Sequence, residues 1–513
     1  MIIGLTGATG NMGQDALAEL LKLPIVTRIK ILGHNPKRTK KLLQKNKKYQ
    51  NKIDVIYGGI NNHDSVKEFI ADCDYVINMA AVIPPLADKR PDLAVSTNEL
   101  GVKVLIEEIE KLSCEPKFIH ISTMGIYGNR DYKHPFGEVG DPLLPSPFDI
   151  YSLSKMRGEF SVLESNIKNW VILRQTAVLY NEMLFKNVSD GLMFHTCFNA
   201  PLEWVTSEDS AILIKNIILK DNLGELNNDN FWLHCFNIGG GLGGRVTGYE
   251  VFDEGFKLIG ASTTKFFKPN YNATRNFHGM WYSDGYKLEE LFHYQNESFT
   301  DCWHRVAKTY PFLKIAKIIP TKLLKHFVID KLLKDSNAPM YWTKNGDTPR
   351  VNAYLGGIDE FNKIGESWRD FPLVCKNQNP DVLVDYETFK ATPTYLEHGF
   401  DLHKNLKLIN LSDLQNVAKM HGGSLITADF TTGDIYTKVE WVDQDGNHFW
   451  AKPYTVLGCG HWYNISYQQN VWDFDRLSKK DQIYAQIWYD THTPFENKRY
   501  SYTDDFKSHE EDI

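Results

Sequence analysis

The chain has 513 residues, of which 42% are hydrophobic and 24% are charged, and its net charge is −7. This length predicts two to four domains, and the acidic balance disfavours nucleic acid as a main partner. Seven scattered cysteines without a C-x-x-C pair argue against a disulfide framework or a zinc site, so we expect no bound metal. The sequence shows neither a signal peptide nor a long uncharged apolar run, so we expect a cytoplasmic protein without a transmembrane segment.

A glycine-rich turn follows the first expected strand. The apolar residues 1–5 lead into TGATGNMG at residues 6–13, and a helical pattern follows at once. Gly7 would permit a tight turn, Gly10 would let backbone N–H groups approach a pyrophosphate, and Gly13 would let the helix pack against the strand. We expect cofactor contacts from Gly7, Ala8, Thr9, Gly10, Asn11, Met12 and Gly13. The alternative is an ordinary tight strand–helix turn.

The loop after the second expected strand, residues 28–33, bears on the identity of the cofactor. An NAD-binding unit usually places an acidic residue there to hold the ribose 2′-hydroxyl. This loop has no acid, and Lys37 and Arg38 could pair with a 2′-phosphate. We therefore expect NADP in preference to NAD, with His34, Asn35, Lys37 and Arg38 near the adenosine. The alternative is that the basic residues are only solvated surface.

Strands and helices alternate through the first 125 residues. Further strands are expected at residues 54–58, 74–81 and 117–123, and helices at 65–72 and 98–111. This alternation predicts a parallel, doubly wound sheet. Ligands bind such sheets at the carboxyl ends of the strands. The glycine-rich turn, residues 78–81, and Ser122 with Thr123 all lie at such ends.

Tyr151 and Lys155 form a candidate catalytic pair. They are four residues apart in an expected helix and therefore share one face. A free tyrosine has a pKa of about 10, and a nearby ammonium group would stabilise the phenolate for proton transfer at a carbonyl or carbinol. A hydroxyl from the end of the preceding strand, Thr123 or Ser122, could hold the substrate oxygen. Tyrosine and lysine at this spacing are frequent on any helix, so the pair matters only together with the other motifs.

Four motifs together resemble the extended short-chain dehydrogenase/reductase family. They are TGATGNMG, NMAA at residues 78–81, STMGIYG at 122–128 and YSLSK at 151–155. The family includes nucleotide-sugar epimerases, dehydratases and hydroxysteroid-type dehydrogenases, and the resemblance covers about residues 1–300. It implies a Rossmann-type sheet with a substrate lobe. It also implies that Tyr151 is the general acid/base and that Lys155 lowers the pKa of Tyr151 and binds the nicotinamide ribose. Thr123 would be the catalytic hydroxyl, with Ser122 as a substitute.

The resemblance also implies further cofactor contacts. These would come from Gly59, Ile60, Met79, Ala80, Ala81, Gln175 and Thr176. Two positions depart from the family pattern: Gly59 stands where an aspartate often touches the adenine, and Gln175 replaces a residue that is commonly aromatic or proline. No acid follows Thr123, which favours a plain oxidoreductase or an epimerase over a dehydratase.

The expected substrate lobe draws on residues 83–87, 180–204 and parts of 240–300. Its many aromatic side chains favour an apolar or aromatic substrate, although they could instead form the core of the lobe. We therefore expect an NADP-dependent oxidoreductase that acts on a carbonyl or hydroxyl group of an apolar or aromatic substrate. The alternatives are an epimerase that retains NAD(P) and, from another class, a cofactor-sensing scaffold.

Beyond residue 300 the family resemblance ends. We expect a helical or irregular extension at 301–400 and a small α+β module at 401–513. Residues 312–334 carry six lysines and one acid at helical spacing, which could place a basic helix on an anionic membrane or simply cap a domain. The module, with strands at 436–441, 448–454 and 460–462, resembles a degenerate zinc ribbon without its cysteines. We expect it to serve docking or oligomerisation, and the protein to form a homodimer.

Overall fold

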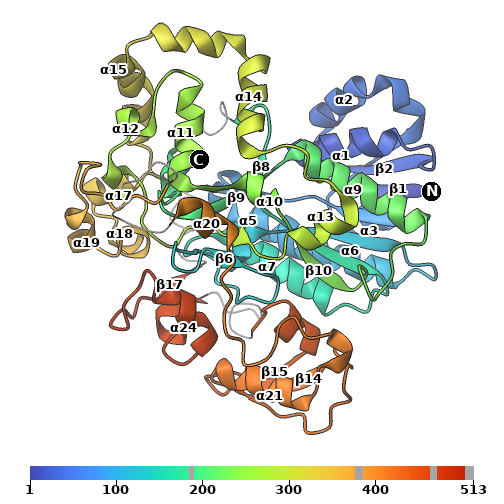
Figure 1. Cartoon of the computed structure of the whole chain (residues 1–513). Helices are drawn as coiled ribbons and strands as arrows, with labels where there is room; N and C mark the ends of the chain where they lie inside the picture. The colour runs from blue at the N-terminus through green and yellow to red at the C-terminus, as the bar shows by residue number, and fades with distance from the viewer. Residues whose placement is uncertain (184–189, 376–384, 463–470, 503–513) are drawn as a thin grey trace.

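A seven-stranded parallel sheet forms the centre of the N-terminal half (Figure 1). The computed structural model describes residues 1–183, 190–375, 385–462 and 471–502; residues 184–189 of the expected substrate lobe, and parts of the segments beyond residue 300, lie outside these ranges. The sheet order is β10-β7-β5-β4-β1-β2-β3. The strands are β1 (Ile2–Thr6), β2 (Arg28–Gly33), β3 (Ile53–Tyr57), β4 (Tyr75–Asn78), β5 (Lys117–Thr123), β7 (Trp170–Gln175) and β10 (His234–Ile238). The predicted Rossmann-type sheet is confirmed.

The sheet order reverses between β1 and β4, which pair with Ile3 opposite Tyr75. The strands are short runs of β-branched and other apolar residues, as expected for parallel strands covered on both faces. Ile3 and Leu5 of β1, for example, are fully buried. The reversal places the ends of β1 and β4 beside each other, and this is where ligands bind in doubly wound sheets.

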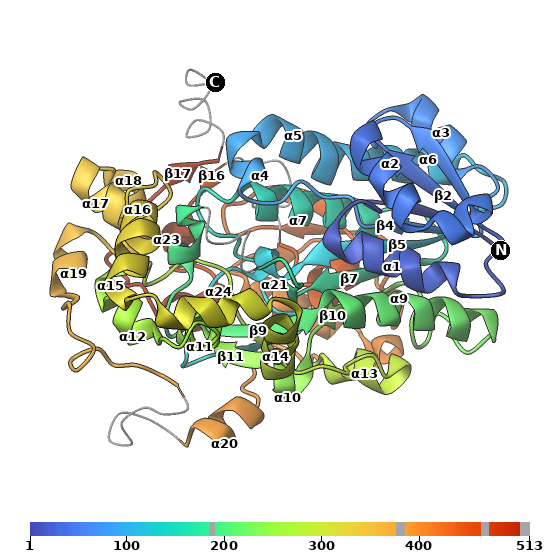
Figure 2. The ribbon, with the colours of Figure 1, turned by 90° about the horizontal axis from the view of Figure 1, so that it is seen from above.

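Helices cover both faces of the sheet. One face packs against α1 (Asn11–Leu21), α9 (Ser207–Asn222) and α13 (Tyr286–Phe292), and α1 lies beside α9 (Figure 2). The other face packs against α3 (His63–Ile70), α6 (Gly101–Glu110) and α7 (Ile150–Leu163). Shorter helical elements connect them: α2 (Pro36–Lys45), η1 (Lys47–Lys52), α4 (Leu86–Lys89), α5 (Pro91–Val95), η2 (Ser96–Leu100) and η3 (Met124–Tyr127).

The substrate lobe adds two small sheets beside the carboxyl ends of the parallel strands. They are β11-β9-β8, formed by β8 (Ala177–Leu179), β9 (Pro201–Thr206) and β11 (Arg245–Thr247), and β12-β6, formed by β6 (Phe136–Gly137) and β12 (Trp281–Tyr282). The helical elements of the lobe are η4 (Gly191–His195), α10 (Gly241–Gly244), α11 (Gly248–Lys257), α12 (Thr263–Phe266) and η5 (Pro269–Tyr271).

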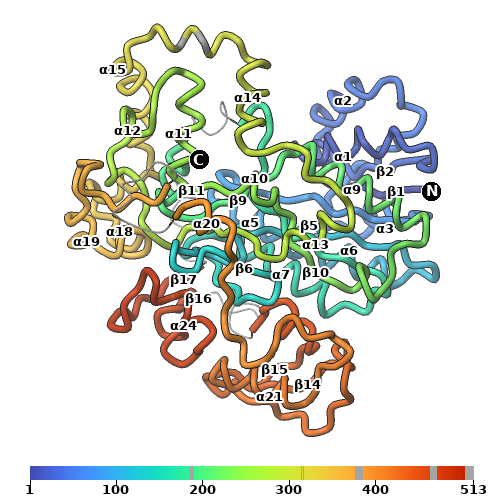
Figure 3. The backbone as a smooth tube through the Cα atoms, viewed as in Figure 1, coloured from blue at the N-terminus to red at the C-terminus, as the bar shows by residue number. Residues whose placement is uncertain are grey.

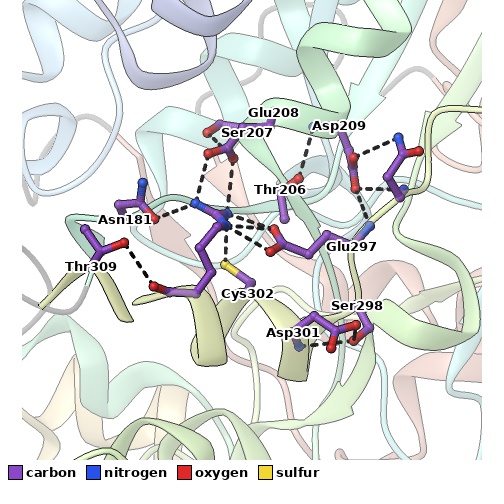
Figure 4. Close-up of polar contacts among 12 residues, drawn as sticks. Asn181, Thr206, Ser207, Glu208, Asp209, Glu297, Ser298, Asp301, Cys302 and Thr309 are labelled. Atoms are coloured by element: carbon purple, nitrogen blue, oxygen red, sulfur yellow. Dashed lines mark hydrogen bonds and ion pairs between the residues drawn. The ribbon is translucent and has the colours of Figure 1, made fainter. Parts of the chain in front are cut away.

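The first helix of the extension, α14 (Phe299–Thr309), spans the boundary expected at residue 300. Arg305 of α14 connects the helix to the lobe through Asn181, Glu208 and Glu297, which Figure 4 shows close together. The guanidinium lies 2.8 Å from Glu297 and 3.0 Å from Glu208, and it donates a 2.5 Å hydrogen bond to Asn181. This half-buried network joins α14 to the ends of β8 and β9, so the helix packs as part of the lobe.

The rest of the extension is helical. Its elements are η6 (Pro311–Ile318), α15 (Thr321–Leu324), η7 (Lys325–Ile329), α16 (Asp330–Leu332), α17 (Pro339–Asn345), α18 (Thr348–Leu355), α19 (Ile358–Lys363) and α20 (Tyr386–Ala391). The basic helical pattern at 312–334 is divided at Pro320, where a start or a break was expected: a 3-10 segment precedes it and a helix follows it, because proline interrupts the hydrogen-bond ladder. In the described part of the chain, no helix has the length and apolar character needed to cross a bilayer.

From α20 the chain passes to a C-terminal module below the sheet (Figure 3). The module contains η8 (Leu406–Leu408), α21 (Leu411–Met420), η9 (Tyr454–Gly458) and an antiparallel sheet of β13 (Ser424–Leu425), β14 (Val439–Val442) and β15 (His448–Ala451). The strand expected at 460–462 does not form. Gly460 instead has a φ of +69° and passes so close to Asp141 that a Cβ would lie 2.0 Å from its carbonyl oxygen.

The module packs directly against the parallel sheet and its helices. Its buried Trp441 belongs to one continuous core with Trp170 of β7 and Val162 of α7. Lys452 donates a 2.8 Å hydrogen bond to the carbonyl oxygen of Leu163, the last residue of α7, and a 2.6 Å hydrogen bond to that of Ser165, just beyond the helix. The described C-terminal residues finish with β16 (Val471–Trp472), α23 (Phe474–Leu477), α24 (Gln482–Trp488) and β17 (Tyr500–Ser501), which pack beside the loop that precedes α7.

Candidate active site

The glycine-rich turn has the geometry of a phosphate-binding turn. Gly7 has a φ of +68°, and a Cβ there would lie 2.5 Å from the Met79 carbonyl oxygen. A Cβ on Gly13 would lie 2.2 Å from the Gly7 carbonyl oxygen, so α1 packs tightly on the turn. Gly10 is exposed, and a Cβ there would meet only the Gly7 oxygen at 3.2 Å. No side chain caps the N-terminus of α1, which leaves room above Gly10 for an anionic group.

The turn is fixed to the neighbouring strand by Thr6. Its hydroxyl donates a 2.7 Å hydrogen bond to Asn78 and accepts hydrogen bonds of 3.1 Å from the backbone N–H groups of Met79 and Ala80. The Asn78 amide in turn lies 3.1 Å from His120 Nδ1 on β5. Three adjacent strand ends are thereby held in register at the point where the sheet order reverses.

The candidate catalytic side chains come together at the end of β5. The hydroxyls of Tyr151 and Thr123 are hydrogen-bonded, and the Thr123 oxygen also accepts a 3.1 Å hydrogen bond from the backbone of Gly125. Lys155 is almost fully buried and donates a 2.6 Å hydrogen bond to the Ile121 carbonyl oxygen. Ser122, also buried, has no hydrogen-bond partner for its hydroxyl within the described ranges.

Burial dominates the protonation of this group. It raises the pKa of Tyr151 to about 12, although the hydrogen bond with Thr123 acts in the opposite direction. Burial also lowers the pKa of Lys155 to about 8, against the attraction of the nearby Glu159 carboxylate. At neutral pH the phenol is therefore protonated and can donate a proton, while the lysine is mostly charged.

The start of α7 is fixed by its capping residue. The Asp149 carboxylate accepts a 2.9 Å hydrogen bond from the Ser152 backbone N–H and a 2.5 Å hydrogen bond from the Ser152 hydroxyl. The preceding residue, Phe148, has a φ of +61°, which is rare for a bulky side chain. Its ring lies 5.0 Å from that of Tyr500 and 5.2 Å from the Arg350 guanidinium. The residues around the helix start thus hold Tyr151 in place.

A single cavity of about 870 Å³ connects the turn with these side chains. Of the residues predicted from the sequence, thirteen line it: Gly7, Gly10, Asn11, Met12, Gly13, Met79, Ala81, Ser122, Thr123, Tyr151, Lys155, Gln175 and Thr176. The remainder of the wall comes from other loops of the sheet domain, from the lobe and from the extension. The cavity volume suits a dinucleotide end together with a small substrate.

The other predicted residues lie outside this cavity. Ala8 and Ile60 are buried in the cores on the two sides of the sheet, and Thr9 and Ala80 belong to the backbone of the turn and of the β4 end. His34, Lys37 and Arg38 are exposed beyond β2, where the Asn35 side chain caps α2. Gly59 follows β3, and its carbonyl oxygen accepts a hydrogen bond from Ser65.

Unpartnered polar atoms are concentrated in the cavity wall. Both amide atoms of Gln175, which is only 7% exposed, have no hydrogen-bond partner among the described residues. The same holds for one buried atom in each of Asp88, Ser122, Ser146, Trp204 and His278. Buried polar atoms normally have partners, so this concentration indicates a ligand with several polar groups. The open space over Gly10 and these atoms fit a bound dinucleotide and a substrate.

Several wall residues were not predicted from the sequence. Asp88 of α4 and Asp149, the N-cap of α7, line the cavity. Burial together with the Asp149 charge raises the pKa of Asp88 to about 7. Four more come from the extension: Ser336, Asn337, Arg350 and Tyr354. They carry no local motif, because only the folded chain brings them to the site. In the sequence, the only local indication of such residues was the Pro145–Asp149 loop, which precedes the helix that carries Tyr151.

The aromatic residues of the lobe divide between wall and core. Trp204, Phe277 and His278 line the cavity, together with His195, whose pKa is lowered by burial to about 4. Phe194 and Phe198, by contrast, are buried in the core of the lobe. The many aromatic residues of this part of the sequence therefore form the core of the lobe as well as the wall of the cavity.

A buried ion pair supports the helix that carries Tyr151. Glu159, one turn after Lys155, lies 2.6 Å from Arg174 of β7, and neither side chain is exposed. Arg174 also donates a 2.7 Å hydrogen bond to the Cys459 carbonyl oxygen, and His461 lies 3.0 Å from Glu159. The C-terminal module thus completes the hydrogen bonding beneath the active-site helix. No cluster of three or more potential metal ligands occurs in the described parts of the chain.

Part of the chain is similar in sequence to known proteins. Over 122 residues the chain is 33% identical to the dTDP-4-dehydrorhamnose reductase of Mycolicibacterium smegmatis, and over 132 residues it is 30% identical to the UDP-glucose 4-epimerase of Rickettsia bellii. Each match covers 24% of this chain, and the chain spans 35% and 39% of the lengths of these relatives.

Similar solved structures are a Bacillus anthracis dTDP-glucose 4,6-dehydratase in complex with NAD and a Bacillus cereus UDP-glucuronic acid 4-epimerase. The TM-scores are 0.48 and 0.45, and the sequence identities are 19% and 21%. They cover 62% and 61% of this chain and 98% and 99% of their own chains. The sequence profile of the NAD dependent epimerase/dehydratase family matches residues 3–178. The matched residues carry the glycine-rich turn, Thr123, Tyr151 and Lys155.

Proposed function

We propose that this chain is an NAD(P)-dependent oxidoreductase that interconverts a carbonyl and a hydroxyl group, with Tyr151 as the proton donor and acceptor. The observation that carries the proposal is the single cavity in which the phosphate-binding turn and the hydrogen-bonded Tyr151–Thr123 pair face the same space. The match of residues 3–178 to a family of NAD-dependent enzymes supports it.

The residues divide the work as follows. A bound nicotinamide would supply or accept the hydride. In the direction of reduction, the neutral Tyr151 hydroxyl donates its proton to the carbonyl oxygen, which the Thr123 hydroxyl orients. The Lys155 ammonium would hold the nicotinamide ribose and stabilise the phenolate left behind. The turn around Gly10 and the N-terminus of α1 would bind the pyrophosphate.

The cavity wall favours a substrate with both a flat apolar face and several hydrogen-bonding groups. Phe148, Trp204 and Phe277 offer aromatic surface, while Ser146, Asp88 and the Gln175 amide offer buried polar atoms without partners in the described chain. A sugar ring has both properties. The mixed wall therefore favours a more polar substrate than the aromatic content of the sequence suggested. It supports a second candidate function, that of an epimerase that retains its cofactor. The similarity to the Rickettsia epimerase supports the same candidate.

We also propose that NADP is preferred to NAD. Lys37 and Arg38 lie exposed at the start of α2, in a loop without an acid. The double variant Lys37→Glu/Arg38→Glu should weaken NADPH binding by about 10- to 100-fold, since charged hydrogen bonds contribute about 1.5–3 kcal/mol, and should leave NADH binding nearly unchanged. Lys47→Glu/Lys48→Glu, the same charge change at two exposed lysines beyond α2, is the matched control. Fluorescence titrations in which NADH binds more tightly to the wild type would refute the preference.

The catalytic proposal is tested with Tyr151→Phe. The purified variant should bind NADPH as the wild type does, because the ring remains, but turnover of carbonyl compounds and nucleotide sugars should fall by about 10²- to 10⁴-fold. Tyr57→Phe, which changes the exposed tyrosine at the end of β3, should have no effect. Unchanged turnover in Tyr151→Phe would remove this residue from the mechanism. Epimerisation without net consumption of NADPH would favour the second candidate.

A further inference from the structure

Exposed apolar side chains gather on the segment that joins α14 to α17, residues 311–334. Ile318, Phe327 and Ile315 expose 82%, 69% and 61% of their surfaces. With Phe312, Ile319 and Leu323 they make up six of the nineteen exposed large apolar side chains in the described chain. Such side chains normally occur singly, so their concentration in one short segment marks an interaction surface.

The 311–334 segment has a fixed inner face and an outer face turned away from the molecule. Ile329 and Leu332 are buried against Phe266 and Phe267 of the lobe, and Leu313 packs near Trp303 of α14. The segment runs along the top edge of the molecule in Figure 1, opposite the C-terminal module, and lies toward the viewer in Figure 2. The exposed side chains therefore lie on an outer rim that the rest of the described chain does not cover.

The same rim is positively charged on an acidic protein. Lys317, Lys322, Lys331 and Lys334 are exposed, and none of them forms an ion pair with a described residue. The one acid of the segment, Asp330, lies 2.9 Å from Lys325 and is thereby neutralised. The whole chain has a net charge of −7, so this local excess of positive charge is distinctive. Its chemistry complements a surface that is anionic outside and apolar beneath.

We propose that the 311–334 segment docks this protein on an anionic phospholipid surface. The exposed isoleucines and Phe327 would enter the boundary between headgroups and acyl chains, while the lysines would remain at the level of the phosphates. A second copy of the chain fits this surface less well, because a twofold contact would bring the two sets of lysines against each other. The contact is peripheral, since no described helix can span a bilayer.

The test is flotation of the full-length protein with vesicles. Wild-type protein should float with vesicles of phosphatidylcholine mixed with phosphatidylserine, and much less with vesicles of phosphatidylcholine alone. Added salt should weaken the binding, because it screens the lysines. Wild-type protein that remains at the bottom of the gradient with both kinds of vesicle would overturn the proposal.

Substitutions separate the apolar contribution from that of charge. Ile318→Ser/Phe327→Ser should reduce partitioning by at least about tenfold, because two large apolar side chains no longer leave water on binding. The matched control is Leu223→Ser/Phe495→Ser, which removes two side chains of 70% and 94% exposure elsewhere. All four side chains are exposed, so thermal unfolding should show that both variants keep the fold.

Lys322→Gln/Lys331→Gln should reduce binding to the anionic vesicles by about fivefold per lysine and leave binding to neutral vesicles unchanged. Lys41→Gln/Lys47→Gln, with the same charge change on and after α2, is its control. Equal flotation of the patch variants and their controls would overturn the proposal. So would a patch-dependent dimer in sedimentation velocity without vesicle binding, since the occupant would then be a second copy of the chain.

Discussion

Removing the buried arginine beneath α7 should have one of the largest effects on stability that a single substitution can have in this chain. Arg174 and Glu159 are both fully buried, and the guanidinium also donates hydrogen bonds to Tyr127 and to the carbonyl oxygens of Val139 and Cys459. Arg174→Met keeps an unbranched side chain but leaves the Glu159 carboxylate with His461 as its remaining polar partner. Loss of one partner of a buried pair costs about 3–5 kcal/mol.

The double variant distinguishes the pair from simple packing. In Arg174→Met/Glu159→Leu no charge remains buried, so the cost should fall to about 1–2 kcal/mol, which reflects the carbonyl groups that lose a donor. The two substitutions would then be non-additive by at least about 2 kcal/mol in a double-mutant cycle. The measurement is urea-induced unfolding followed by tryptophan fluorescence.

The exposed pair Arg28–Asp54, at 3.2 Å, provides the control. Arg28→Met should cost less than about 1 kcal/mol, because surface pairs contribute little in water. The reasoning would be refuted if Arg174→Met cost no more than Arg28→Met, or if the two substitutions at the buried pair were simply additive.

Three further predictions concern the turn, the cavity and the C-terminal module. Gly13→Ala should weaken NADPH binding by at least about tenfold in fluorescence titrations, because the new Cβ would displace the Gly7 carbonyl, 2.2 Å away; an unchanged Kd would contradict the tight packing of the turn. Asp88→Asn should raise the Tm at about pH 8 but not at about pH 4. Burial raises the pKa of Asp88 in the folded protein to about 7, so ionisation of the wild-type carboxyl reduces stability as the pH rises from about 4 to about 7. An equal Tm difference at both pH values would exclude this cause. Trp441→Ala should lower the free energy of unfolding by about 3–5 kcal/mol, because the side chain is fully buried. Trp450→Ala, on the neighbouring strand and 54% exposed, should change it by less than about 0.5 kcal/mol. Similar losses in the two variants would show that the module core is not continuous with the sheet.

The sequence alone sufficed for the sheet and for the centre of the site because both are encoded locally. Apolar runs such as β1 end in glycine or hydroxyl residues, and Tyr151 and Lys155 share a helical face whatever the rest of the chain does. The structure places both side chains in the cavity with Thr123. Their roles in catalysis remain predictions.

The remaining wall of the cavity could not be predicted, because its residues meet only through tertiary packing. Asn337 and Arg350 reach the site from about two hundred residues beyond Tyr151, without a motif of their own. The left-handed backbone of Phe148 likewise has no signature in its residue type. The expected strand at 460–462 failed for a related reason: its direction is set by the close approach of Gly460 to Asp141, which no local pattern reveals.

The loop before α7 is held by residues far along the chain, and this has a consequence for biosynthesis. The Pro145 carbonyl accepts hydrogen bonds from Trp472, 327 residues later, and from Tyr502, 357 residues later. At a translation rate of about 5–20 residues per second, the ribosome needs on the order of 20–70 s to deliver these partners. During that interval the loop that carries Ser146 and Phe148 of the pocket wall would lack these partners, so this part of the wall should become fixed only after residues 472–502 have left the ribosome.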